Sequence, residues 1–126
     1  MIKSAIVTKL RAEAGVIAIV AQRIFIGEAP QGQALPYIIV SGITAARPTT
    51  HDGVVGLTDQ LIQISCIAET LAKRENLTAA VVACLNGFRG SAGSITIQYS
   101  EIENETDIPP DPDYGYQTAI DFRVIY

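Results

Sequence analysis

The chain has a single histidine, His51, and the next residue is an acid, Asp52. A histidine beside a carboxylate can serve as a general base or as a metal ligand. A catalytic histidine also requires a nucleophile and an orienting group, and a metal site requires several ligands. The sequence groups no such residues around His51, so we expect it to be a solvated loop residue.

A dense run of acidic residues invites a cation site; it consists of Glu101, Glu103, Glu105, Asp107, Asp111 and Asp113. Its spacing differs from that of a calcium-binding loop, and Pro109, Pro110 and Pro112 stiffen the segment. No two of these carboxylates stand out as an acid–base pair. We expect residues 104–115 to form an acidic, proline-rich loop that is solvated and faces a partner.

The two cysteines, Cys66 and Cys84, fall in segments with the pattern of a buried core. Cys66 has no base nearby in the sequence, so packing is favoured over nucleophilic catalysis. We expect two reduced, buried side chains, with a disulfide as the less favoured alternative. The glycines at positions 87, 90 and 93 precede no helix, so no phosphate-binding loop is indicated. The sequence thus points to no catalytic, cofactor-binding or metal-binding residue.

The most distinctive stretch, residues 23–40, joins two apolar runs through a loop rich in proline and glycine. Pro30 and Pro36 lack a backbone donor and Gly32 permits positive φ, so these residues restrict the shape of the loop. None of them is an acid, a base or a nucleophile. This segment therefore specifies a shape rather than a reaction.

The composition is that of a protein whose surface is partly covered by a partner. Only 17% of the 126 residues are charged and 48% are hydrophobic, whereas about 25% charged residues is usual for a soluble domain. The net charge is −4 and the nine basic residues are scattered, which disfavours a surface for duplex nucleic acid. Mean hydropathy is +0.28, but the N-terminal segment is charged and lacks an apolar run long enough for a signal peptide or a membrane span. We expect one cytoplasmic domain, residues 1–126.

Two segments have the periodicity of amphipathic helices, residues 2–14 and the stretch from Thr70 to about Asn86. Thr70 is a suitable N-cap for the second helix, and Gly15 is a suitable stop for the first. Residues 16–21 fit either a strand or one more helical turn. The buried face of the second helix is expected to carry Leu77, Val81, Cys84 and Phe88.

Strands are predicted where apolar and β-branched residues alternate or cluster, at residues 23–26, 37–44, 61–68, 95–103 and 116–126. A bulge is expected near Ser100, because the alternation changes phase there. In the last strand, the inward face is expected to carry Ile120, Phe122 and Val124. The whole order predicts an α+β domain, an antiparallel sheet of about five strands with two main helices packed on one face.

Apolar side chains on predicted loops mark contact surfaces more often than chemistry. Two valines stand between glycines at the apparent tip of a hairpin in the turn region 45–57, and the acidic loop also carries two large apolar residues. The alternative is that each of them packs on its own sheet. With two outward charges of the last strand, the interface candidates are Val54, Val55, Ile108, Tyr114, Asp121 and Arg123.

Several segments, in their order and spacing, together resemble the tail-completion family (tail terminator or head–tail joining proteins) of long-tailed bacteriophages and prophages. They are Ile24–Phe25, Ala29–Gly32, Leu35–Ile38, Asp52–Leu57, Gln63–Thr70 and Ala119–Tyr126. The resemblance implies a structural virion protein, not an enzyme, that caps the finished tail tube as a ring, commonly a hexamer, and presents a surface for head–tail joining.

The partners that the resemblance implies are further copies of the chain, the tail tube protein and a head connector or neck protein. DNA would pass through the ring without specific binding, and an acidic protein suits such a channel because basic walls would hold phosphates. The resemblance implies no cofactor and no membrane. It places the protein in the host cytoplasm during assembly and then at the tail–head junction of the virion. A small oligomeric enzyme or ligand-binding domain with a pocket between subunits stays open as an alternative.

Overall fold

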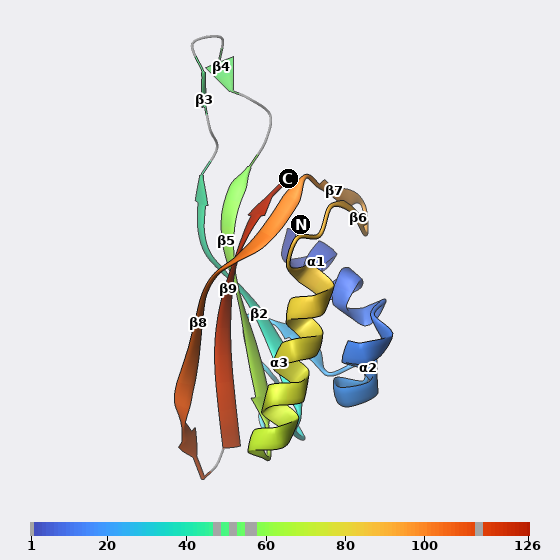
Figure 1. The fold of residues 1–126 in the computed structure, drawn as a ribbon, viewed down its shortest axis with the longest axis vertical. Helices are drawn as coiled ribbons and strands as arrows, with labels where there is room; N and C mark the ends of the chain where they lie inside the picture. Colours follow the sequence, from blue (N-terminus) through green and yellow to red (C-terminus); the bar gives the residue numbers. More distant parts are fainter. Residues whose placement is uncertain (1, 47–48, 51–52, 55–57, 113–114) are drawn as a thin grey trace.

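The computed structural model of the chain describes residues 2–46, 49–50, 53–54, 58–112 and 115–126, without the side chains of 44–46, 49–50, 53–54 and 111. The elements in chain order (Figure 1) are α1 (Ile2–Arg11), α2 (Ala14–Val20), β1 (Ile24–Ile26), β2 (Tyr37–Ala46), β3 (Thr49–Thr50), β4 (Gly53–Val54), β5 (Asp59–Ala68), α3 (Leu71–Leu85), β6 (Gly90–Ala92), β7 (Ile95–Ile97), β8 (Tyr99–Asp111) and β9 (Gly115–Ile125).

The main sheet contains five strands in the order β1-β2-β5-β9-β8. The α+β class is confirmed, but the sheet is mixed, because β1 pairs with β2 in parallel while the other neighbours are antiparallel. The purely antiparallel prediction was wrong for a geometric reason. A strand of three residues spans only about 10 Å, so the segment 27–36 can return to the starting end of β1 and enter β2 in the same direction.

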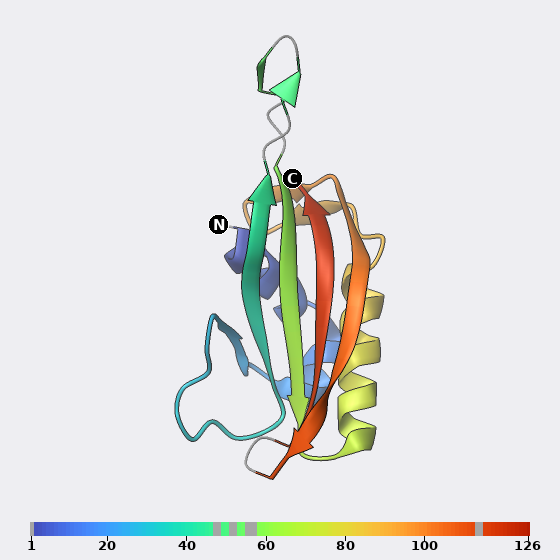
Figure 2. The ribbon, with the colours of Figure 1, turned by 90° about the vertical axis from the view of Figure 1, so that its left-hand side faces the viewer.

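All three described helices lie on one face of the main sheet, as Figures 1 and 2 show together. The expected ambiguity at residues 16–21 is resolved as helix, and Gly15 lies inside α2 instead of ending α1. The first helix ends at Arg11, because Glu13 adopts an extended backbone (φ −93°, ψ 115°) before α2 begins. No helix of the described residues is long and apolar enough to cross a lipid bilayer.

The core fills the space between the sheet and the helices. The inward face of β9 is confirmed, since Ile120, Phe122 and Val124 are buried in one cluster with residues of all three helices. In α3, the Thr70 side chain accepts a hydrogen bond from the Lys73 amide at 3.2 Å, which confirms the predicted N-cap.

Strand β8 replaces most of the loop that was predicted at residues 104–115. The strand continues to Asp111 and pairs with β9 along its length. It is the outermost strand of the sheet, so only one of its edges must supply hydrogen bonds, and Pro109 and Pro110 are tolerated there. The register shifts between Ile102 and Asn104, and again between Ile108 and Asp111, instead of near Ser100.

The predicted turn region 45–57 contains regular structure as well. Strand β2 extends to Ala46, and β3 and β4 form a small antiparallel hairpin with the pairs Thr49–Val54 and Thr50–Gly53. In Figure 1 this hairpin lies beyond the end of the main sheet, well away from the helices. A second small hairpin, β6–β7, lies near the ends of α1 and β9.

Candidate functional site: assembly surfaces

The residues with potential chemistry do not form a catalytic group in the described part of the chain. Burial raises the pKa of the Cys66 thiol to about 12 and that of Cys84 to about 11, so both are protonated at neutral pH and poorly nucleophilic. Both cysteines are free. Among the described residues, no three His, Cys, Asp or Glu side chains are grouped so that they could hold a metal ion. His51 lies outside the described residues.

The face of the sheet opposite the helices carries a charged network that joins three strands. Arg123 on β9 donates from Nε to both carboxylate oxygens of Asp59 on β5, each at 3.0 Å, and its Nη2 also contacts Asp59. Its Nη1 lies 3.9 Å from Glu103 on β8. The hydrogen bonds from Arg123 lower the pKa of Asp59, and Asp59 in turn raises the pKa of Arg123.

Asp121 lies on the same face of β9, two residues before Arg123. Its Oδ1 accepts a hydrogen bond from Nε2 of Gln63, its direct cross-strand neighbour on β5, at 3.2 Å. Asp121 and Arg123 therefore point away from the helices, as predicted. Each already has a partner within the subunit, so either could contact a neighbour only as part of its network.

The other interface candidates are distributed over the molecule. Ile108 is half-buried on β8 opposite Gln117. The backbone of Val54 belongs to β4 in the projecting hairpin, while its side chain, Val55 and Tyr114 lie outside the description. The candidates that the structure describes thus form no single site. Their role in assembly stays a prediction.

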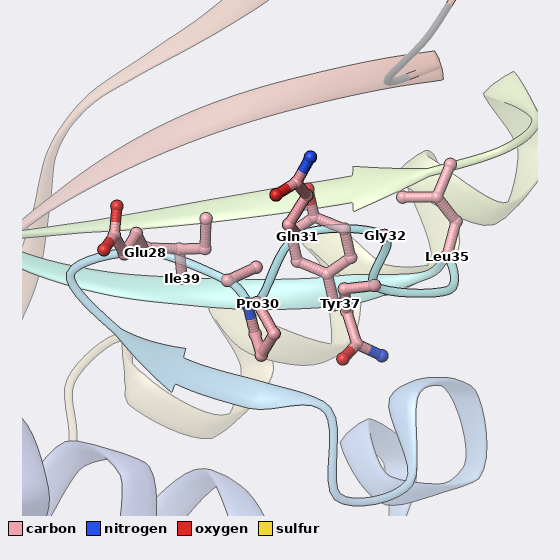
Figure 3. Close-up of a pocket in the computed structure, with 9 residues that line it drawn as sticks. Glu28, Pro30, Gln31, Gly32, Leu35, Tyr37 and Ile39 are labelled. Carbon is pink, nitrogen blue, oxygen red and sulfur yellow. The ribbon is translucent and has the colours of Figure 1, made fainter.

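The shape-specifying segment 27–36 creates a hollow near the edge of the sheet. A solvent-open cavity of about 690 Å³ lies between this segment and β2, with Tyr37 and Ile39 on its strand side (Figure 3). Gly27 and Gly32 adopt positive φ (81° and 76°), which a glycine permits without strain. The carbonyl of Pro36 accepts a hydrogen bond from Arg23 Nε at 2.7 Å, which anchors the end of the segment beside β1.

This arrangement can bind a surface of complementary shape more readily than it can catalyse a reaction. The cavity combines apolar groups with amide and carboxylate groups, from Pro30 and Leu35 to Gln31 and Glu28 (Figure 3). A contact of this kind would depend on shape together with the polar side chains of the lining, Glu28, Gln31 and Gln33.

The comparison with protein families identifies the chain. A model of the family described as "Tail completion protein gp17" matches residues 4–126. The chain belongs to this family. The resemblance inferred from the sequence is confirmed, and the membership supports a structural role for this tail-completion protein in a phage-type virion.

The fold of this tail-completion protein also occurs in a solved particle. A chain of the "Virion of native gene transfer agent (GTA) particle" superposes with a TM-score of 0.77, at 19% identity, over 98% of this chain and 92% of that chain. At this identity the likeness shows the fold alone. No curated protein sequence matches the tail-completion protein.

One buried charge of the tail-completion protein was missed by sequence reasoning. Arg74 on α3 is only 6% exposed. Its Nη2 lies 2.8 Å from Glu75 and 3.7 Å from Asp107 on β8, and its guanidinium stands over the ring of Tyr116. Asp107 also accepts a hydrogen bond from Thr118 at 2.8 Å. Arg74 therefore links α3 to the far half of the β8–β9 pair.

A signal for this burial exists in the sequence. Arg74 precedes Leu77 by three positions and Val81 by seven, so it lies on the buried stripe of the helix. The Nε atom of Arg74 has no hydrogen-bond partner among the described residues. A charged residue type hid a position that helical periodicity alone would have assigned to the interior.

Proposed function

We propose that this protein closes the head-proximal end of a finished phage tail tube as a ring, and that the ring supplies the surface for head–tail joining. The observation that carries the proposal is the family match, which spans residues 4–126. The solved neighbour supports it, because its printed title describes the virion of a gene transfer agent particle, and a chain of that particle has this fold.

The shape of the subunit is compatible with this role. One face of the sheet is covered by helices, and the other lies open in Figure 2 with a hydrogen-bonded polar network on it. The β3–β4 hairpin extends beyond the end of the sheet (Figure 1). A subunit of this kind offers an uncovered sheet face, two lateral edges and a projecting hairpin, and each of these surfaces is available for contacts in a ring.

The proposed partners are further copies of the chain, most simply six in a ring, the tail tube protein, and a head connector or neck protein. DNA would pass through the ring without specific contacts, and the net charge of −4 suits a passage that must not retain phosphates. The protein would act structurally, without a reaction or cofactor, first in the host cytoplasm and then in the virion.

Cryo-microscopy of purified tails tests the proposal. The expected result is a ring of density at the head-proximal end of the tube into which this fold fits in six copies. Tails that lack this chain at that end, yet join heads normally, would overturn it. Density for a different number of copies would correct the ring size and leave the capping role standing.

A function as a ligand-binding domain is the second candidate, and the cavity of about 690 Å³ beside the segment 27–36 favours it. A neighbouring subunit could close this open cavity. Heads and tails that join normally when Gln31 and Leu35 are both replaced by alanine would agree with either function. A bound small molecule in the same tail density would favour the ligand-binding function.

A further inference from the structure

The two lateral edges of the main sheet differ in charge on the side that the helices cover. The outermost strand β8 has no basic residue. Its residues Glu105 and Asp107 lie on the helix side, because their cross-strand partners on β9 are buried there. At the opposite edge, helix α1 contacts β1, has no acidic residue and ends at Arg11. Figure 2 shows β8 and β1 on opposite sides of the sheet.

The charges at these two edges are poorly compensated within the subunit. Glu105 is exposed and has no ion pair among the described residues. Asp107 lies 3.7 Å from Arg74, but its side chain is 64% exposed. Arg11 is exposed too, and in the described part of the chain it donates only to backbone carbonyls, among them that of Ile24 at 3.2 Å. Each edge therefore presents a charge that another molecule can pair.

Arg11 also lines a groove between α1 and β1. The groove has a volume of about 370 Å³, is open to solvent and has no acidic side chain in its lining. Its apolar lining includes Val7, Ile24 and Ile26, and Ile26 is 45% exposed. A groove with apolar walls and an unpaired cation is complementary to a strand edge that carries carboxylates.

The groove and the acidic edge lie at the same level along the strands. Cross-strand pairing places Asp107 in one row with Ile24, and Glu105 in one row with Ile26. The Ile24 carbonyl that accepts from Arg11 lies between these two rows. In a ring whose axis runs along the strands, neighbouring copies keep the same level and the same side of the sheet. The rotation then brings the acids of one copy to Arg11 of the next.

We propose that the helix side of the β8 edge, with Glu105 and Asp107, docks against the groove between α1 and β1 in the next copy of the chain, where Glu105 pairs with Arg11. Two identical β8 edges would repel each other, so the acidic edge requires a different surface on its partner. Such head-to-tail contacts build a closed ring when the rotation closes. This inference rests on the proposed ring.

The contact is made by side chains and not by a continued strand ladder. In β1, the Ile24 amide donates to the Gln22 carbonyl at 2.9 Å, and the Ile26 carbonyl accepts from the Glu28 amide at 3.0 Å. These backbone groups are already bonded within the subunit, so β1 has little to offer to another strand. Charge and the shape of the groove therefore decide the pairing.

A charge-swap series tests the contact. Glu105→Lys alone and Arg11→Glu alone should each weaken subunit association by about tenfold or more, because like charges then face each other. The double variant should recover association, since its swapped charges again oppose. Glu13→Lys is the matched control, because Glu13 does not line the groove and has no ion pair among the described residues. Association is measured by native mass spectrometry of the protein and by occupancy on purified tail tubes, with circular dichroism to verify folding.

Arg11→Gln decides the question if a variant with Arg11→Glu does not fold. A glutamine amide can still donate to the Ile24 carbonyl, whereas the positive charge is lost. Added salt should weaken the association of the wild type, because exposed charge pairs are screened. The association of Arg11→Gln should be weaker at low salt and should depend less on salt. Equal association and equal salt dependence of the two proteins would overturn the contact.

The results separate this inference from the proposed function. Wild-type rings on tails, together with single variants that assemble like Glu13→Lys, would overturn the edge contact and leave the capping role intact. Single variants that still form rings but no longer bind tail tubes would also overturn it, because the groove would then contact the tube protein. A folded double variant that assembles no better than either single variant would do the same. Tails without any ring of the wild-type chain would overturn both proposals. Weakened singles and a recovered double variant would support the contact.

Discussion

Replacement of Phe122 by alanine probes the packing between the sheet and the helices most directly. Phe122 is fully buried, at 0% exposure, and it lies opposite Ile62 on β5 and Ile102 on β8. Loss of its ring leaves a cavity. The cavity cannot close easily, because β5 and β8 on either side are held in place by their hydrogen bonds to β9. Buried Phe→Ala changes of this kind cost about 3–5 kcal/mol.

The magnitude is large relative to the whole stability of a small domain, which is about 5–15 kcal/mol. The neighbouring residue supplies the control. Asp121 points to the other face and accepts one hydrogen bond, from Gln63, so Asp121→Ala should cost only about 0.5–1.5 kcal/mol. Urea unfolding followed by circular dichroism measures both variants, with the slope of the transition compared to exclude a change in the denatured state.

The ordering of the two variants is the decisive result. If the Phe122→Ala variant is unfolded while the Asp121→Ala variant is folded, the result agrees with the predicted order of stability. If Asp121→Ala lost as much free energy of unfolding as Phe122→Ala, the assigned faces of β9 would have to be exchanged, and the open polar face would be the core.

Three further predictions follow from the surfaces. Replacing both Val54 and Val55 by aspartate should leave the monomer folded but abolish assembly, since burial of unpaired carboxylates in an interface costs several kcal/mol. Sedimentation measures assembly and circular dichroism measures folding. An unfolded monomer would contradict the interface role of the two valines. Because Arg123 lowers the pKa of Asp59, the stability from this pair is present above the ordinary pKa of about 3.9 and is lost as pH falls through the lowered value. Asp59→Asn should therefore be less stable than the wild type at neutral pH, and the difference in urea midpoint should shrink below about pH 4; a difference that does not depend on pH would refute the linkage. Arg74→Met should unfold at a urea concentration close to that of the wild type, because a buried charge with an unpaired Nε stabilises the fold little more than an apolar side chain of similar length. A loss of more than about 3 kcal/mol in the free energy of unfolding would contradict this and show that the ion pairs of Arg74 stabilise the fold.

Local patterns predicted the elements that depend on nearby residues. The N-cap at Thr70 and the burial of Ile120 and Phe122 on one face of β9 were both confirmed. A cap depends on a single nearby side chain, and the faces of a strand depend only on the alternation of residues along it. The parallel pairing of β1 with β2 was not predictable in this way. Strand direction depends on where the segment 27–36 returns, which no local period encodes.

The candidate surfaces were predicted less completely, because they depend on distant residues. Arg123 was expected to point outward, but its pairing with Asp59 joins positions that are 64 residues apart. Arg74 was not included in the predicted buried face of α3, although its spacing from Leu77 fits the buried stripe. A charged residue type predicts exposure, whereas the helical spacing of Arg74 predicts burial. The two predictions disagree where a charged side chain is buried with an ion-pair partner.

Strand β8 shows why an acidic, proline-rich segment can be misassigned. Prolines and repeated carboxylates are typical of loops, but they also protect the outer edge of a sheet from pairing with an identical edge. The pairing with β9 is local in sequence, and it holds the strand in place through Asp111 despite the prolines. The same charges that prevent two β8 edges from meeting permit a contact with a basic edge. A protected edge therefore disfavours a symmetric dimer through two β8 strands, and in the proposed ring it would favour a contact between different surfaces of neighbouring copies.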